Sequence, residues 1–188
     1  DSIEFVQKKA EVLEAAKLAA MPLPAQDTIK QSIGISDSAK TSLVNENYKD
    51  FAIATVGSKE TFVLENSKLK ATISNKGGQI EKIELKDFTR SGSTENLILF
   101  DKDSTSFALK LNAYDRSRIF STDSFYFKSV SQTPTSIILQ LQTSKPGSYI
   151  EYSYSLKPDD YLVDSEIRFV GMQSIISQTE DQLQLNWS

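Results

Sequence analysis

From about residue 58 to the end of the chain, apolar and polar residues alternate with a period of two. This is the pattern of a β-strand with one buried and one solvated face. About ten such runs follow one another with short polar turns and no helical interludes. Parallel strands need long crossover connections, so the strands must pair mainly antiparallel. The sequence therefore predicts an all-β fold in which two antiparallel sheets pack face to face.

The phase of each run predicts which side chains fill the core, because residues two apart point to the same face. Asn75 to Gly78 form a predicted turn, since the two glycines can adopt positive φ. Ile80 is out of phase with Ile83, which predicts a β-bulge near Glu81 and Lys82. The residues that we expect to be buried are Leu69, Ile73, Leu109, Leu139, Leu141, Ile167 and Phe169.

The first 57 residues differ in character from the rest. Helical spacing of apolar residues and an Ala-rich run predict a helix over residues 1–21, which Pro22 ends. Its apolar stripe is thin, which favours a solvated or partner-dependent helix over a core element. Residues 22–57 are polar and aperiodic, so we expect a linker in which Phe51, Ile53 and Val56 form a short strand or a packed patch.

Two absences limit the chemistry that this chain can perform. It has no His and no Cys. Ser-His-Asp catalysis, thiol nucleophiles and the usual zinc sites are therefore excluded. Acidic and basic residues are mixed, with a net charge of −4, so nucleic acid is not an expected partner. No apolar run reaches the ~20 residues that would span a bilayer.

The remaining candidates for chemistry each have a simpler structural explanation, which we favour. Four carboxylates could pair for glycoside hydrolysis, but they lie on the solvated faces of predicted strands. The acidic stretch 101–104 lacks the Gly and the distal Glu of a calcium loop. Gly77 and Gly78 could cradle a phosphate, but a strand and not a helix follows them. The four carboxylates are Glu65, Glu84, Glu151 and Asp164.

Two groups of residues could instead bind a ligand. The stretch from Tyr114 to Arg118 places two arginines beside an aromatic ring, which could clamp an anion or a sugar or simply keep a loop soluble. Tyr149, Tyr152 and Tyr154 could line a carbohydrate-binding face. Tyr152 and Tyr154 share the buried phase of their strand, however, which favours core packing. We therefore predict no catalytic, cofactor-binding or metal-binding residues, and no cofactor.

Several segments occur in an order that resembles the periplasmic domain of YidC-type membrane protein insertases. The resemblance covers roughly residues 58–188. Its opening is the strand pair around the Asn-Lys-Gly-Gly turn at 75–78. The segments that carry it are Thr61 to Lys86, Leu97 to Asp101 with Ser106 and Phe107, Tyr161 to Phe169, and Leu183 to Ser188.

The resemblance implies a β-supersandwich similar to galactose mutarotase at residues 58–188, incomplete at the C-terminus. It also implies that residues 1–57 form a helix and tether that follow a transmembrane anchor absent from this chain. The implied function is a non-catalytic scaffold that assists insertion and folding of inner-membrane proteins. The implied location is the periplasmic side of the bacterial inner membrane, with Sec translocon components and nascent membrane proteins as partners.

Two other functions stay open from the residues alone. One is a carbohydrate- or peptide-binding β-sandwich module of the cell envelope. The other is an enzyme of mutarotase type, which the lack of His disfavours, since similarity of fold does not carry activity.

Overall fold

The computed structural model describes residues 37–101, 107–177 and 184–187. Most of the regular structure in these residues is β-strand. The described helices are the α-helix α2 (Asp37–Tyr48) and the short 3-10 helices η1 (Lys49–Ala54) and η2 (Thr122–Ser124). The strands are β1 (Thr61–Glu65), β2 (Leu69–Ser74), β3 (Ile80–Thr89), β4 (Asn96–Asp101), β5 (Phe107–Asn112), β6 (Ile119–Ser121), β7 (Lys128–Gln132), β8 (Ser136–Gln142), β9 (Tyr149–Leu156), β10 (Val163–Val170) and β11 (Gln184–Trp187).

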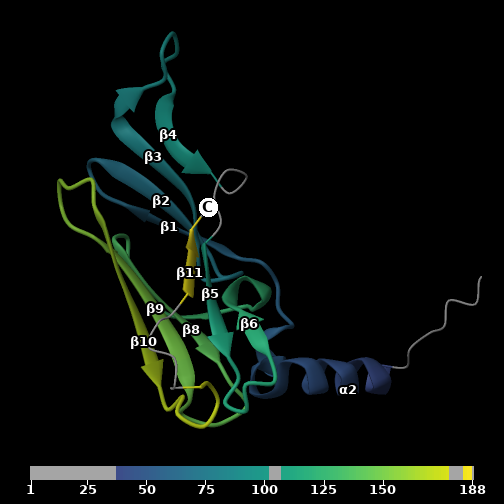
Figure 1. The fold of residues 1–188 in the computed structure, drawn as a ribbon. Coiled ribbons are helices and arrows are strands. Elements are labelled where there is room, and N and C mark those ends of the chain that lie inside the picture. The colour runs from purple at the N-terminus through teal and green to yellow at the C-terminus, as the bar shows by residue number, and fades with distance from the viewer. Residues whose placement is uncertain (1–36, 102–106, 178–183, 188) are drawn as a thin grey trace, which may run out of the picture. The chain divides into compact units, whose positions relative to one another are not determined.

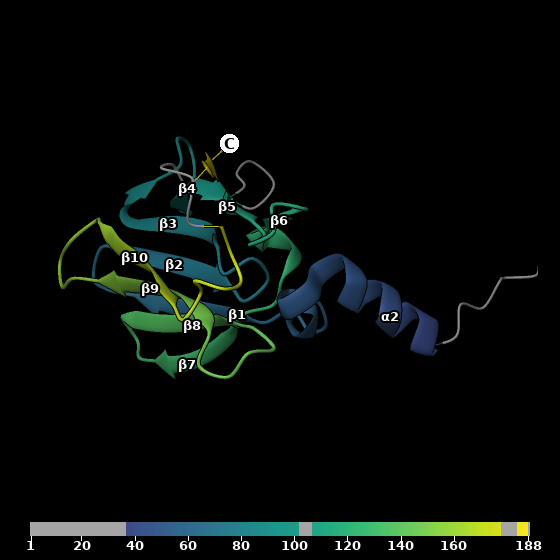
Figure 2. The ribbon, with the colours of Figure 1, turned by 60° about the horizontal axis from the view of Figure 1, so that its bottom comes forward.

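Every strand pairing between these elements is antiparallel, as predicted. One four-stranded sheet has the order β1-β2-β3-β4, and a second has the order β10-β9-β8-β7. Figures 1 and 2 show these two sheets as separate layers. The described residues also form a third, three-stranded sheet, with the order β11-β5-β6, that the sequence did not predict. The antiparallel β-sandwich class is confirmed.

A single hydrophobic core joins both large sheets. Leu69 and Ile73 come from one sheet, and Leu139 and Leu141 come from the other; none of the four is accessible to solvent. Leu109 on β5 is also buried. The alternation therefore predicted the buried face of β2, β5 and β8 correctly.

Two predicted core residues are only partly buried. Ile167 and Phe169 lie on β10 and pack against the core without being enclosed by it. β10 is the edge strand of its sheet, with β9 on one side. An edge strand has neighbours on one side alone, so its inward side chains keep part of their exposure. The phase was right, but the sequence could not place the strand at an edge.

The turn and the bulge are where the sequence placed them. Gly77 and Gly78 have φ of 78° and 64°, and Ser74 N–H donates to Gln79 O across the turn at 2.8 Å. In the next ladder Thr72 pairs with Lys82 and Ile73 with Ile80, so Glu81 is left without a partner. This extra residue is the predicted β-bulge.

The N-terminal part differs from the prediction. Residues 37–54, expected within an irregular linker, are helical, first as α2 and then as η1. From residue 41 onward the side chains of α2 are exposed or half-buried. In η1, however, Phe51 is fully buried in the core. The expected helix over 1–21 lies outside the described residues.

Candidate interaction surface

The four carboxylates considered for catalysis are each paired with a cation. Lys86 contacts Glu65, Lys82 contacts Glu84 at 3.0 Å, and Lys157 contacts Asp164 at 3.4 Å. The hydrogen bond from Lys82 is the main reason that the pKa of Glu84 lies below its usual value.

The fourth carboxylate, Glu151, accepts a hydrogen bond from Gln140 Nε2 at 2.8 Å and lies 3.7 Å from Arg168. These carboxylates are therefore members of surface ion pairs. None of them forms the shared carboxylate pair that glycoside hydrolysis requires.

The Gly77-Gly78 turn is packed from both sides and leaves no room for a phosphate. Gly77 N–H donates to Phe125 O at 2.9 Å, so it is not free to bind an anion. A Cβ atom on Gly78 would lie 2.9 Å from the ring of Tyr152. The hydroxyl of Tyr154 donates to Gly78 O at 2.6 Å. The turn is therefore a structural element, as favoured from the sequence.

The same contacts decide the role of the tyrosine strand. Tyr152 and Tyr154 are buried in the core, and burial raises the pKa of both hydroxyls. The Tyr152 hydroxyl lies 3.4 Å from Thr122 Oγ1. Tyr149, on the opposite face of β9, is half-buried. Tyr152 and Tyr154 therefore pack in the core of the sandwich, as favoured from the sequence.

The loop from Tyr114 to Arg118 connects β5 to β6 and forms hydrogen bonds with the helical segment α2–η1. Lys49 of η1 contacts Asp115, and its ammonium lies 3.0 Å from Ser117 Oγ. The hydrogen bond from Lys49 is the main reason that the pKa of Asp115 is well below its usual range. Arg118 donates to the backbone and side-chain oxygens of Asn47 at 3.1 and 2.9 Å. The charged groups of Asp115 and Arg118 thus fasten the N-terminal segment to the loop.

Other site types find no support among the described residues. No cluster of three acidic side chains suited to a metal ion occurs there. Asp101 ends β4, and the rest of the acidic stretch 101–104 lies outside the described residues. No helix in the described segments has the length and apolar character needed to cross a bilayer.

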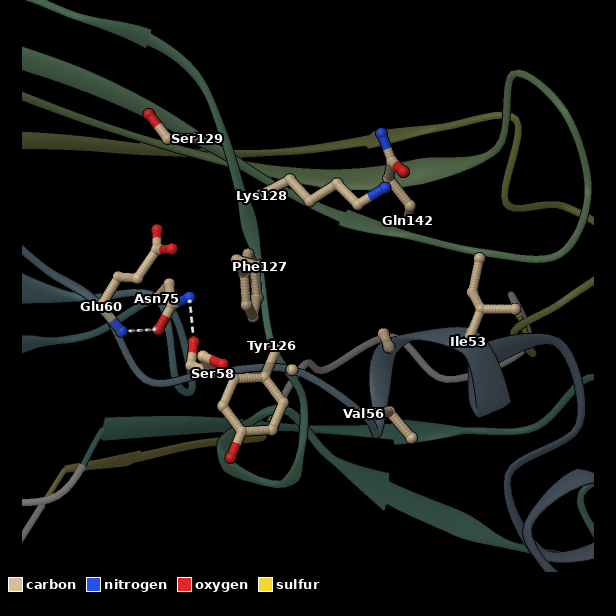
Figure 3. Close-up of a pocket in the computed structure, with 12 residues that line it drawn as sticks. Ile53, Val56, Ser58, Glu60, Asn75, Tyr126, Phe127, Lys128, Ser129 and Gln142 are labelled. Carbon is tan, nitrogen blue, oxygen red and sulfur yellow. Dashed lines mark hydrogen bonds between the residues drawn. The ribbon is translucent and has the colours of Figure 1, made fainter. Parts of the chain in front are cut away.

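The structure does contain a pocket of about 420 Å³ beside β7 (Figure 3). One wall is the segment Ile53–Glu60, and the other includes Lys128 and Ser129 of β7 with Gln142 of β8. Asn75 fixes the first wall: its Oδ1 accepts from Glu60 N–H at 2.8 Å and its Nδ2 donates to Ser58 O at 3.0 Å. These two hydrogen bonds therefore hold the backbone of Ser58 and Glu60 in place along one wall of the pocket.

Tyr126 joins the two walls of this pocket. Its N–H donates to Ala54 O at 2.7 Å. A Cβ atom on Gly57 would lie 2.7 Å from Tyr126 Cγ, so only glycine lets the chain pass this closely over the ring. The Lys76 ammonium lies 4.1 Å from the ring centroid and donates to Ser124 O at 2.7 Å. Burial lowers the pKa of Lys76.

Residues 61–188 match the family described as the YidC periplasmic domain. The chain belongs to this family. The resemblance drawn from the ordered sequence segments is thereby confirmed, and the family match begins at the first residue of β1.

Relatives of this YidC periplasmic domain match over its whole length. Proteins named membrane protein insertase YidC are 30% identical in Parabacteroides distasonis, 31% in Porphyromonas gingivalis and 28% in Bacteroides fragilis, each over all 188 residues. The chain spans only 29%, 27% and 27% of the length of these three relatives. No solved structure matches the chain at a significant level.

Sequence reasoning missed most of the pocket. It singled out Ile53 and Val56 as part of a patch, but it had no reason to place them opposite Lys128. Ile53 and Val56 are more than seventy positions from Lys128. The contacts that shape the pocket join the N-terminal segment to Asn75 in the turn after β2 and to Tyr126 just before β7. The one local signal was Gly57, a glycine between a short apolar run and the first strand.

Proposed function

We propose that this domain is the periplasmic, non-catalytic part of a membrane protein insertase, where it serves as an interaction scaffold. The observation that carries this proposal is the family match over residues 61–188, together with relatives named as insertases that align with the whole chain. The domain assists the insertion and folding of inner-membrane proteins. Its partners are nascent membrane proteins and components of the Sec translocon, reached through the full-length protein.

The surface chemistry supports a scaffold over a catalyst. The chain lacks His and Cys. The carboxylates considered for catalysis are engaged in ion pairs. What the described surface offers is a framed pocket and exposed apolar side chains such as Val56 and Leu99. Features of this kind suit contact with another polypeptide.

We also propose that residues 1–57 tether the β domain to a membrane anchor on the periplasmic face of the inner membrane. Among the described residues, α2 is polar around most of its surface, as expected of a helix that crosses solvent between two bodies. Phe51 then fixes the end of the tether in the core. The β domain itself begins near residue 58 in this proposal.

The test uses the full-length protein that contains this chain, in cells depleted of their own insertase. Insertion of a single-span reporter is followed by protease accessibility, and contacts are followed by photo-crosslinking from exposed positions of this domain. The full-length protein should restore insertion, and the crosslinks should join this domain to membrane proteins or translocon subunits. Failure of the full-length protein to restore insertion would contradict the insertase assignment. Restored insertion without any such crosslinks would contradict the scaffold role.

A further inference from the structure

The pocket lies beside a strand that still has a free edge. β7 is the last strand of its sheet and pairs only with β8 among the described strands. All five of its residues are exposed. Just before β7 the outer side is already occupied, since Phe127 N–H donates to Asn75 O at 2.8 Å. Backbone groups alternate in direction along a strand, so Ser129 directs its N–H and C=O outward, where they can bond an added segment.

Only the first part of this edge is suited to pairing. Lys128 and Ser129 pair regularly with Gln140 and Leu139, but the register shifts before Ser131, so Val130 is a bulge. Bulges twist an edge and limit long ladders. The regular part, Lys128 and Ser129, is the part that lines the pocket. An added segment would therefore be short and would run into the pocket.

The pocket walls carry opposite charges and exposed apolar groups. Lys128 stands on one wall and Glu60 on the other, and neither forms an ion pair with any described residue. Ile53 is 55% exposed and Val56 is 80% exposed. Figure 3 shows the Glu60 carboxylate at the left of the close-up and the Lys128 side chain in its upper centre, extending toward Gln142. An occupant with apolar side chains, an acidic group at one end and a basic group at the other would match this arrangement.

A polypeptide fits the pocket better than a sugar. Sugar sites commonly use an aromatic ring with a face open to the ligand. The ring of Tyr126 is covered by Gly57 and has the Lys76 ammonium 4.1 Å from its centroid. By contrast, an extended peptide can use the edge of β7 for backbone hydrogen bonds and the walls for its side chains.

We propose that the pocket between β7 and Ile53–Glu60 binds a short, extended protein segment of mixed charge and alternating apolar residues, which bonds the outward backbone groups of Ser129 and contacts the side chains of Lys128, Glu60, Ile53 and Val56. The inference deepens the proposed function, since it names the kind of client or partner segment that the scaffold holds. The inference rests on the proposed function only for the identity of the protein that supplies this segment.

The experiment titrates this chain with the blocked hexapeptide Asp-Val-Thr-Val-Thr-Lys and records backbone amide and methyl NMR spectra. The amides of Lys128 and Ser129 and the methyl groups of Ile53 and Val56 should shift together. A second peptide with proline in place of both valines lacks two of the N–H donors and should bind at least about fivefold more weakly.

Two pairs of variants separate the pocket from general effects. Lys128→Glu should weaken binding about fivefold or more, as expected of reversing a partly solvated charge contact. Lys110→Glu, an exposed lysine on β5, is its matched control and should leave binding unchanged. Val56→Asp should also weaken binding, whereas Ile119→Asp on β6, 67% exposed, should not.

Several results would overturn the inference. These are no shift at the pocket residues with millimolar peptide, equal effects of Lys128→Glu and Lys110→Glu, or equal binding of the proline peptide. Shifts of the same residues with a neutral oligosaccharide but not with the peptide would assign the pocket to sugar. Shifts that depend on protein concentration alone would assign it to a second copy. A failure here alongside restored insertion in the cellular test would leave the proposed function standing.

Discussion

Truncation of Phe51 to alanine is the most informative test of how the N-terminal segment joins the sandwich. Phe51 is inaccessible to solvent although it belongs to a short 3-10 helix outside the sheets. Its ring centroid lies 5.2 Å from that of Phe120 and 5.2 Å from that of Phe125, nearly parallel to the latter at 27°. The side chain of Phe51 therefore packs in the core between Phe120 and Phe125.

The expected loss can be estimated from the burial. Replacing a fully buried phenylalanine by alanine typically costs about 3–5 kcal/mol, through lost transfer energy and the cavity left behind. The two ring contacts favour the middle of this range or above. At about 2–4 °C per kcal/mol for a domain of this size, a loss of about 4 kcal/mol lowers Tm by about 8–16 °C.

The assay is urea and thermal unfolding of the chain, followed by circular dichroism. Ile53→Ala is the matched control, since Ile53 lies in the same 3-10 helix but is 55% exposed. It should cost less than about 1 kcal/mol, as surface substitutions usually do. If Phe51→Ala costs no more than Ile53→Ala, then η1 is not part of the core in solution and the reasoning is wrong.

Three further changes test other contacts by the same unfolding measurements. Gly78→Ala should cost about 2 kcal/mol or more of unfolding free energy, because its Cβ atom would lie 2.9 Å from the Tyr152 ring. Gly92→Ala is the control: it is also at positive φ but has open space around it, so it should cost about 1 kcal/mol. Equal losses would contradict the packing argument. Tyr154→Phe should cost about 1–3 kcal/mol, since it leaves the buried side of Gly78 O without its donor, and a neutral result would mean that water replaces the hydroxyl. Asp115→Asn should reduce the fall of Tm at acidic pH. The lowered pKa of Asp115 adds stability above about pH 4, and this stability is lost as the pH falls through the folded-state pKa. An unchanged fall of Tm at acidic pH would show that the Lys49 contact is not maintained.

The sequence by itself determined the strands and their faces. Alternation is a local property, because successive side chains on a strand point to opposite sides. It identified the buried phases of β2, β5, β8 and β9. The out-of-phase Ile80 identified the bulge at Glu81. The glycine pair identified the turn, since positive φ is a property of single residues. The ordered segments also identified the family.

Only the tertiary structure decided how these local pieces meet. The sequence placed Phe51 in a short strand or packed patch of the linker, and its burial depends on Phe120 and Phe125, which lie some seventy positions later. Ile167 kept part of its exposure because β10 is an edge. The pocket needs Gly57 against Tyr126 and Lys128 across from Glu60. Such contacts depend on the packing of distant segments, and a pattern that repeats every two residues contains no information about which strand edges or loops lie side by side.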